Sequence, residues 1–526
     1  MGTGTAMDTG MDKKPANRAW PHRSTAVLIG VALTVPPVAA QSTEKGAEPK
    51  QAVSVSTRVT VTETWTDNVR LSTAGESELI TEVRPGIRVD VNKARLKGFF
   101  DYALSGIAYA NSTSPSRSLN ALSSNLKLEA IDNTLFVDVS GTISQQATSA
   151  FGPQSVDNTS LNTNQSEVST YRIAPSLKGQ IGTGATYTAQ YSRAVTSSAA
   201  VGASNSATND FTVNVKGDIG TKRLGWTLDV SNQDASFSAG RTTESSKALL
   251  GLVYAVTPLI EVTAGVGNES QNFTSTAKET NPVSGVGVSW RPREATKLSA
   301  VLLRHSYGDT YTLNFDHRTG RTAWQYSDSK ATTQTPNLQG TAGATGSAYD
   351  LYYAQFAATE PDPVARAQLV NSYLQTYGIA PGSSVNSGFV PSSLALQRRQ
   401  QLSFAILGKR DTITFIATQS DSTRLDTLTK AIDDFTTSPT VHQQGWSGNF
   451  AHRLTPDYSF GVLFSQMSSS GTLSSQSNDL RNVNLSLTGK IGKKSTATMG
   501  VRKVESTNSD KPYSESALTA TINLQL

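Results

Sequence analysis

The chain of 526 residues contains no cysteine. This absence excludes disulfide bonds, iron–sulfur clusters, thiolate zinc sites and a lipidated N-terminal cysteine. No stretch supplies the ~18–20 consecutive apolar residues of a transmembrane helix, and the mean hydropathy of -0.31 is too polar for a helical membrane protein. Only 17% of the residues are charged. A transmembrane β-barrel is still compatible with this composition, because only alternate residues of its strands face lipid.

Sequence signals for catalysis and for cofactors are weak. The five histidines do not occur at metal-ligand spacing, and the minimal nucleophile pattern of Ser275 and Lys278 lies in a run rich in serine and threonine. No glycine-rich phosphate-binding motif is present, and the basic residues form neither a long run nor a basic helix. The sequence therefore predicts a protein that is not an enzyme and has no metal, cofactor or nucleic-acid partner. A hydrolase that needs few residues is the alternative.

The N-terminus has the order of a secretory signal peptide. Four basic residues between positions 13 and 23 precede an apolar run at 26–35, and small residues follow up to Ala40. We expect cleavage after Ala40; the alternative is a short membrane anchor. The predicted division is a signal peptide at 1–40, a short periplasmic segment at 41–52 and an outer-membrane β-barrel at 53–526.

The last ten residues show the pattern from which the barrel is inferred. Side chains of a strand alternate between its two faces. Leu518, Ile522 and Leu524 therefore share one face, and Thr519 and Asn523 share the other. A half-apolar strand at the end of a chain would leave an exposed sheet edge, which invites aggregation. Pairing it with the first strand closes the sheet and removes the edge.

The same pattern repeats from Val53 onward, as about ten alternating residues, a tight turn, ten more residues and a longer polar loop. The count predicts an all-β, antiparallel, up-and-down transmembrane barrel of about 22 strands, within a range of 18–22. Strict alternation of short turns with long loops, such as 145–166, 194–208 and 329–399, is typical of outer-membrane barrels. An even number of strands places both termini on the periplasmic side. A soluble β-solenoid is the alternative fold, but no repeat of fixed length is present.

One segment departs from the β pattern. The stretch 349–377 is typical of two short helices, the second with apolar residues at helical spacing from Leu369 to Tyr377, which predicts a helical insert at about 345–385 within a long loop. We expect the insert to lie outside the barrel or in its mouth, as a small cap packed on loops or, alternatively, as a moving gate. The residues predicted to cap or plug the pore are Tyr353, Arg366, Tyr373, Arg398 and Arg399.

Charged residues between the apolar positions are expected to line the lumen. In hydrocarbon each would cost several kcal/mol, whereas a barrel of ~16 strands or more has an aqueous interior. Both signs of charge occur, so charge alone does not define the solute, and a merely solvated wall is the alternative. The cationic candidates are Arg84, Arg88, Lys97, Lys127, Arg172, Lys178, Lys216, Arg453, Lys490 and Arg502.

Several short motifs occur in an order that resembles a known family. They include the stretches at 62–71 and 81–87, the pairs Gln145-Gln146 and Asp157-Asn158, and the run at 397–400. Together they resemble the outer-membrane proteins associated with the PEP-CTERM/exosortase system, which are related to β-barrel porins of exopolysaccharide gene clusters. The resemblance spans essentially the whole chain that follows the predicted signal peptide. It departs at Leu526, where such barrels usually end in an aromatic residue.

The resemblance implies a Gram-negative outer-membrane protein linked to exopolysaccharide export. The partners that it implies are outer-membrane lipid, the exopolysaccharide and periplasmic export components; it supplies no functional residues. The preferred hypothesis is a porin-like conduit for the polymer. The alternative is a non-conducting surface barrel that binds polysaccharide through its long extracellular loops.

Overall fold

The computed structural model describes residues 52–111, 113–199, 205–333, 394–426, 433–473, 476–508 and 511–526, with Arg366, Val370 and Leu428. The predicted signal peptide at 1–40, and the segment that follows it up to residue 51, lie outside these residues. Most of the predicted helical insert at 345–385 also lies outside them, and only Arg366 and Val370, both helical, are described. No helix within the described ranges is long and apolar enough to cross a membrane.

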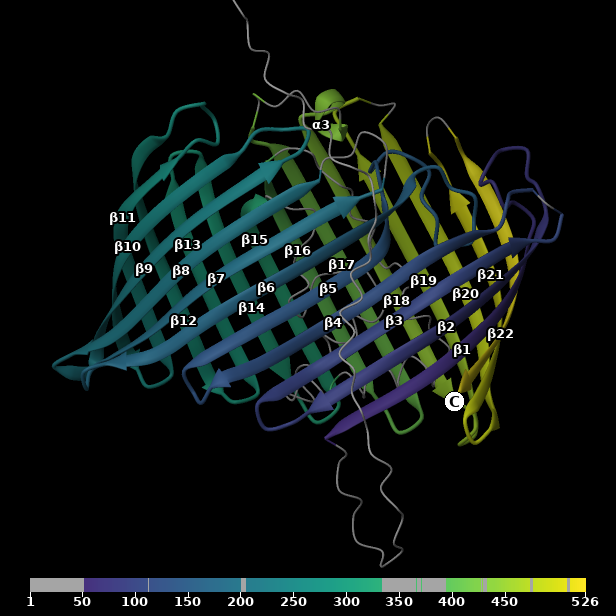
Figure 1. Ribbon diagram of the computed structural model, residues 1–526, viewed down its shortest axis with the longest axis horizontal. Helices are drawn as coiled ribbons and strands as arrows, with labels where there is room; N and C mark the ends of the chain where they lie inside the picture. The colour runs from purple at the N-terminus through teal and green to yellow at the C-terminus, as the bar shows by residue number, and fades with distance from the viewer. Residues whose placement is uncertain are drawn as a thin grey trace, which may run out of the picture. The chain divides into compact units, whose positions relative to one another are not determined.

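The described chain forms one antiparallel sheet of 22 strands, in which every strand pairs with the next one along the sequence (Figure 1). The strands are β1 Val53–Thr66, β2 Glu78–Asn92, β3 Leu96–Tyr109, β4 Arg117–Ile131, β5 Leu135–Ala147, β6 Gln165–Ile181, β7 Ala185–Ser198, β8 Ser206–Ile219, β9 Thr221–Phe237, β10 Thr243–Thr257, β11 Ile260–Gln271, β12 Glu279–Arg293, β13 Thr296–His305, β14 Gly308–Arg318, β15 Thr322–Thr333, β16 Ala395–Leu407, β17 Asp411–Arg424, β18 Thr440–Arg453, β19 Tyr458–Ser470, β20 Ser477–Gly492, β21 Ser495–Ser506 and β22 Tyr513–Gln525.

The first and last strands close the sheet into a barrel. They pair in antiparallel register, with Val59 opposite Leu524 and Trp65 opposite Leu518. The hydroxyls of Thr62 and Thr521 lie 3.1 Å apart across this seam. The predicted closure of the first strand on the last and the predicted number of strands are therefore confirmed.

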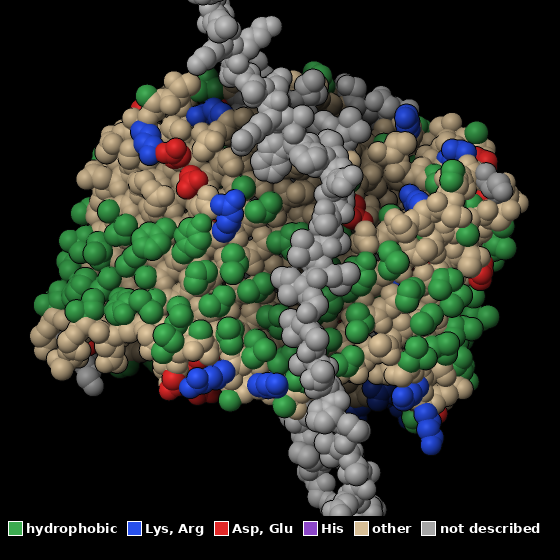
Figure 2. Space-filling model, viewed as in Figure 1, with side chains coloured by type: hydrophobic (Ala, Val, Ile, Leu, Met, Phe, Trp, Pro, Cys, Tyr) green, Lys and Arg blue, Asp and Glu red, His purple; other side chains and the backbone are tan. Residues whose placement is uncertain are grey.

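Large apolar side chains lie on the outside of the barrel and form a continuous belt. Figure 2 shows this belt as a band around the visible face. Met499 is 68% exposed, Leu252 54% and Leu518 52%. Contiguous apolar surface of this extent would be unfavourable in water, because soluble monomers rarely expose patches larger than a few hundred Å². The belt therefore defines the surface that contacts lipid, which is the architecture of outer-membrane β-barrels.

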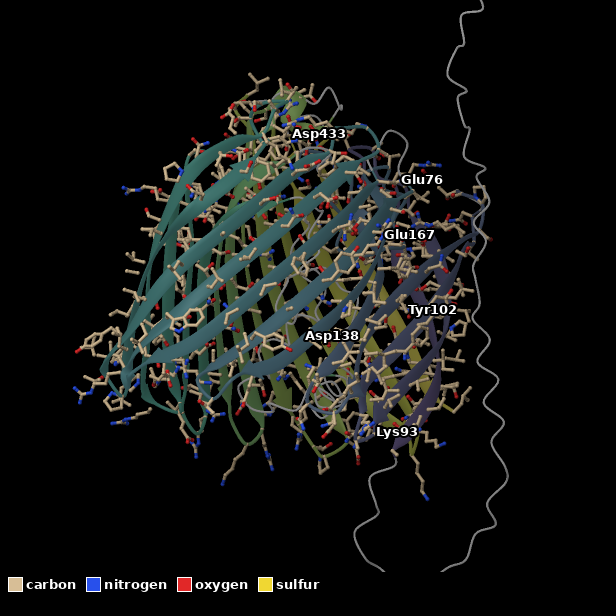
Figure 3. The ribbon with its side chains drawn as sticks, turned by 60° about the vertical axis from the view of Figure 1, so that its left-hand side comes forward. Glu76, Lys93, Tyr102, Asp138, Glu167 and Asp433 are labelled. Atoms are coloured by element: carbon tan, nitrogen blue, oxygen red, sulfur yellow. The ribbon has the colours of Figure 1, made fainter. Side chains whose placement is uncertain are left out.

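The two rims of the barrel differ. Nine of the ten connections at one rim, here called the short-turn rim, have two to four residues, and the tenth, between β8 and β9, has one. The opposite, long-loop rim carries the loops at 67–77, 148–164 and 425–439, and Figure 3 shows Glu76 and Asp433 at its end and Lys93 at the other. Both ends of the sheet lie at the short-turn rim, since Leu526 donates its backbone N–H to Thr57 and Gln525 donates to Lys494.

Toward the long-loop rim the strands continue beyond the apolar belt with polar side chains on both faces. On the outer face the Tyr102 hydroxyl donates to Asn120 at 2.8 Å, and Asn120 donates to Glu167 at 3.1 Å (Figure 3). The predicted loops at 194–208 and 329–399 are therefore too long, because β7, β8, β15 and β16 extend into them. Alternation of apolar with polar residues cannot reveal a strand whose two faces are both polar.

Candidate functional site

The inner wall of the barrel is the candidate functional surface. All ten cationic residues predicted to line the lumen occupy positions opposite in phase to the exposed apolar residues of their strands. Six of them lie near the short-turn ends of their strands and are solvent-exposed, among the carboxylates of Asp138 and Asp218. These six are Lys97, Lys127, Lys178, Lys216, Arg453 and Lys490.

Arg88 is neutralised by neighbouring carboxylates rather than free in the lumen. Its guanidinium lies 2.7 Å from Asp90 and 3.3 Å from Asp101, and its side chain is 7% exposed. Arg58, on the neighbouring strand β1, approaches Asp101 to 2.5 Å, and Arg88 also stacks over the ring of Phe99 at 4.6 Å. Because two cations here face two carboxylates, this cluster stabilises the wall and contributes little net field to the pore.

Lys127 and Lys178 share one aromatic partner. Their ammonium groups lie 5.3 Å and 5.1 Å from the ring centroid of Phe136, which also faces inward. A cation over an aromatic face is stabilised by the ring quadrupole while the charge stays accessible to water. This trio therefore presents two positive charges to the lumen near the short-turn rim.

Arg84 and Arg172 are half-buried cations of the inner wall and have no ion pair among the described residues. Changing both to glutamine should shift ion selectivity toward cations, because a lumen wall acts on ions through its nearby charges and each change removes one positive charge. The expected shift is a change in the reversal potential measured across a planar bilayer in a salt gradient.

The matched control for this pair is Arg193→Gln, which removes the same charge from the outer face, where Arg193 contacts Asn209 at 3.1 Å. Unchanged selectivity in the double variant, or an equal shift in the control, would contradict the assignment of Arg84 and Arg172 to the pore.

Loop 148–164, between β5 and β6, lies inside the mouth of the barrel rather than outside it. Its contacts are with inward-facing side chains of other strands and with the short helix that precedes β18. On one side the Tyr109 hydroxyl of β3 donates to the carbonyl of Thr159 at 2.8 Å. On the other side the Ser149 hydroxyl donates to Asp434 at 2.7 Å, and Asp434 belongs to the short helix α3 Asp434–Thr437 that precedes β18.

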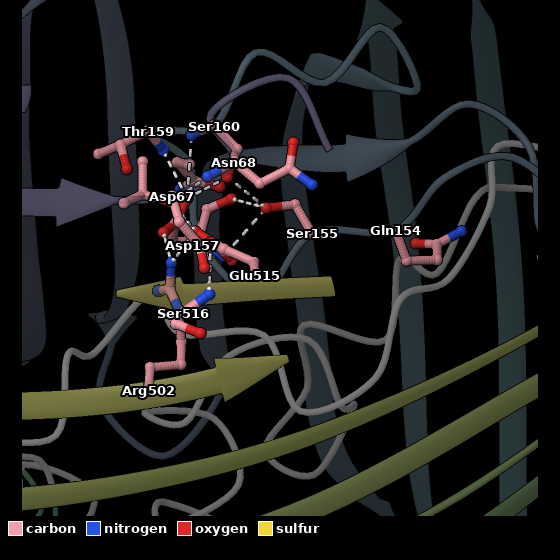
Figure 4. Close-up of polar contacts among 12 residues, drawn as sticks. Asp67, Asn68, Gln154, Ser155, Asp157, Thr159, Ser160, Arg502, Glu515 and Ser516 are labelled. Carbon is pink, nitrogen blue, oxygen red and sulfur yellow. Dashed lines mark hydrogen bonds and ion pairs between the residues drawn. The ribbon is translucent and has the colours of Figure 1, made fainter. Parts of the chain in front are cut away.

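An ion-pair cluster anchors the middle of this loop to the wall (Figure 4). Arg502 of β21 lies 2.5 Å from Asp157 of the loop and 2.8 Å from Glu515 of β22. Thr66 of β1 donates its hydroxyl to Glu515 at 2.8 Å. Burial alone would raise the pKa of Asp157, but the charge of Arg502 and hydrogen bonds from Ser160 outweigh it and hold this pKa well below its ordinary value. Asp157 is therefore a stable anion paired with a wall arginine.

Three apolar side chains of the loop complete the anchoring. Leu161 packs against a cluster that contains Ile107 and Tyr109, and Val156 packs against one that contains Val504 and Tyr513. Phe151 packs against Ala395, Phe435 and Val441 together with Ala150. The loop thus spans an arc of the mouth that runs from β3 through the β1–β22 seam to β16, and it narrows the opening at the long-loop rim.

The sequence identifies 145–166 as a long loop but does not show that it folds inward. Arg502 was expected to face the lumen, and it does so, but as the wall partner of Asp157. The inward position depends on contacts between residues more than 300 positions apart, such as Asn508 with the carbonyl of Phe151 at 2.6 Å. Nothing in the sequence pattern of either segment signals that contact.

The structure describes three of the five residues predicted to cap the pore. Arg398 belongs to β16 and faces outward, where it forms two hydrogen bonds to Asp328, at 3.2 Å and 2.8 Å. It is therefore a wall residue and not a cap, because β16 begins as early as Ala395. Arg399 is next to it on the inward face, and Arg366 is half-buried within the insert. Tyr353 and Tyr373 lie outside the described residues.

No protein-family model and no curated protein sequence matches this chain. Solved structures of similar fold include the FrpB iron transporter of Neisseria meningitidis, with 12% identity, a TM-score of 0.46, and coverage of 90% of this chain and 81% of that one. The outer membrane protein OpdK of Pseudomonas aeruginosa has 8% identity and a TM-score of 0.32, with coverage of 90% and 99%. OccD3 (OpdP) of the same organism has 10% identity and a TM-score of 0.32, with coverage of 90% and 91%. At these scores the likeness adds nothing to the barrel that the strand register shows, and the cargo of those proteins does not carry over.

Proposed function

We propose that the protein is a conduit for a hydrated polysaccharide across the outer membrane, acting in exopolysaccharide export by a PEP-CTERM/exosortase system. Residues 1–40 serve as a cleaved signal peptide that delivers the chain to the periplasm. The short-turn rim then faces the periplasm and the long-loop rim faces the cell exterior. The polymer passes through the lumen and the protein catalyses no reaction. Periplasmic export components deliver the polymer to the opening at the short-turn rim.

The observation that carries this proposal is the polar inner wall of a closed barrel of 22 strands. Inward positions are occupied by hydroxyl, amide and charged side chains around the wall, among them Thr170, Gln190, Asn214 and Thr488. Such groups exchange hydrogen bonds with the hydroxyls of a sugar polymer or with its water, so that a polymer crosses without being desolvated into an apolar phase. The family resemblance supports polysaccharide as the cargo.

The purified protein is expected to form discrete channels in a planar lipid bilayer. A polar lumen bounded by a lipid-facing belt conducts ions whenever its mouth is open, and an anionic oligosaccharide added on one side should produce transient current blocks. Absence of channels, both in the wild type and after replacement of residues 149–163 of the mouth loop by a tight turn, would overturn the conduit.

A non-conducting surface barrel that binds polysaccharide is the second candidate. The observation that favours it is loop 148–164, which is anchored across the mouth by hydrogen bonds, an ion pair and three apolar contacts. Binding of polymer by intact cells without any conductance, before or after loop removal, would select this candidate over the conduit.

A further inference from the structure

A recess of about 410 Å³ opens in the inner wall of β8–β15, on an arc where loop 148–164 makes none of the contacts described for it. This volume lies within the ~300–1,000 Å³ typical of small-molecule sites. Its polar side chains come from neighbouring strands and include Asp210, Gln233, Lys247 and Glu269. Beside it Gly251, Gly265 and Gly285 lie in register on three strands, and the side chains of Thr227 and Leu303 pack over the first and the last of them.

The carboxylates of the recess already have partners. Glu269 is bound by His305 Nδ1 at 2.5 Å and by the Ser245 hydroxyl at 3.2 Å, and its side chain is 7% exposed. The other ring nitrogen of His305 lies 2.9 Å from the Thr310 hydroxyl. Asp210 accepts a hydrogen bond from Ser192 at 3.3 Å. Glu269 is therefore held within the wall, whereas Asp210 is half-buried and has Ser192 as a partner.

Lys247 is arranged differently. It lies directly opposite Glu269 in the β10–β11 register, yet that carboxylate is turned toward His305, at 2.5 Å. The Lys247 ammonium forms no hydrogen bond or ion pair with another described residue. A half-buried ammonium that lines a recess without a partner is an uncommitted donor with a full positive charge. It favours an anionic group on whatever occupies the recess.

The recess also presents apolar surface to water, which a plain solvated wall does not require. Val301 faces inward but is 47% exposed, and Leu303 lies two residues further along β13. Tyr307 stacks on His305 at 4.8 Å and meets Phe273 edge-on at 5.4 Å. Apolar and aromatic faces beside hydroxyl, amide and cationic groups match a pyranose ring, which has C–H faces and a polar edge.

We propose that the β8–β15 recess is a binding subsite for an acidic saccharide unit, whose carboxylate pairs with the ammonium of Lys247. The C–H face of the sugar packs on Val301 and Leu303, and its hydroxyls bond to Gln233 and Thr312. This inference rests on the proposed polysaccharide conduit and defines its cargo as a polymer that contains uronic acid.

The test uses the full-length protein in detergent and isothermal titration calorimetry with an oligomer of glucuronic acid. An oligomer of glucose of equal length is the neutral comparison. Lys247→Met should weaken binding of the acidic oligomer by about tenfold to a hundredfold, the effect of losing one hydrogen bond to a charged group, and should leave the neutral oligomer unaffected. Lys297→Met is the matched control, since Lys297 also faces inward on β13 but does not line the recess.

The outcomes separate this inference from the conduit itself. Preference for the acidic oligomer that is lost in Lys247→Met and kept in Lys297→Met supports the subsite. Equal binding of the two oligomers, equal effects of the two variants, or no binding at all overturns the subsite. In those cases channels in a planar bilayer still support the conduit. Acidic binding at Lys247 in a protein that forms no channels supports the subsite and overturns the conduit.

Discussion

Replacing residues 149–163 with the dipeptide Asn-Gly is expected to increase single-channel conductance several-fold. The ends of the loop are already paired as a hairpin, because Thr148 donates its N–H to the carbonyl of Asn164 at 3.0 Å and its hydroxyl to the Asn164 side chain at 2.8 Å. Asn-Gly forms the type I′ turn that connects two antiparallel strands directly. The β5–β6 ladder therefore stays closed while the part that crosses the mouth is removed. Planar-bilayer recording of wild type and variant measures the change.

A single substitution tests how the loop is held. Asp157→Asn removes the ion pair with Arg502 but leaves the pair of Arg502 with Glu515. Removing one partner of a buried charge pair is strongly destabilising, so openings should become more frequent, with an amplitude that approaches that of the loop replacement. Glu76→Gln is the matched control, because it breaks an exposed pair with Arg70 at the same rim. If the loop replacement conducts like wild type, loop 148–164 does not limit the pore.

Leu252→Arg should destabilise the barrel by about 2–4 kcal/mol, the cost of an arginine near the middle of the bilayer on the lipid face of a barrel. Leu252 occupies the middle of the outward apolar run of β10 and is 54% exposed. The free energy of unfolding can be measured by urea titration in liposomes, with the heat-dependent gel mobility of the folded barrel as the readout.

Val253→Arg provides the control one residue further along the chain. Val253 lies on the opposite face of β10, where an arginine reaches water in the lumen, so its cost should be well below that of Leu252→Arg. Equal losses of unfolding free energy in the two variants would mean that the lipid-facing and lumen-facing sides of β10 are assigned incorrectly. That result would also remove the basis for placing Lys247 and Arg84 in the lumen.

The sequence is sufficient to predict the barrel because each strand carries the same physical constraint. Lipid on one side and water on the other require apolar residues to alternate with polar ones. This alternation is evident at Leu518 and Thr519. Leu252 and Val253 are both apolar, so there it becomes visible only when neighbouring strands are compared. The number of strands and the closure follow from the alternation of turns and loops. The sequence does not predict where strands end beyond the apolar belt, because outward-facing residues there, such as Arg398 and Asp328, are polar.

The mouth and the recess were not predictable in the same way. Asp157 contacts Arg502 only because closure of the sheet brings β21 near the loop that follows β5. The sequence pattern around neither residue indicates the other. The recess depends on Glu269 turning toward His305 and away from Lys247, which is a choice of side-chain conformation. Periodicity determines which face a residue occupies, but not which of several partners on that face it contacts.

The seam between β1 and β22 has a consequence for biogenesis. Thr62 and Thr521 are 459 positions apart, so the sheet cannot acquire its final pairing until the whole chain has left the ribosome and crossed the inner membrane. Contacts of such long range form slowly, and unpaired strands that wait for them associate readily with other chains. A chain truncated before Tyr513 would lack β22 and would therefore leave the edges of β1 and β21 unpaired.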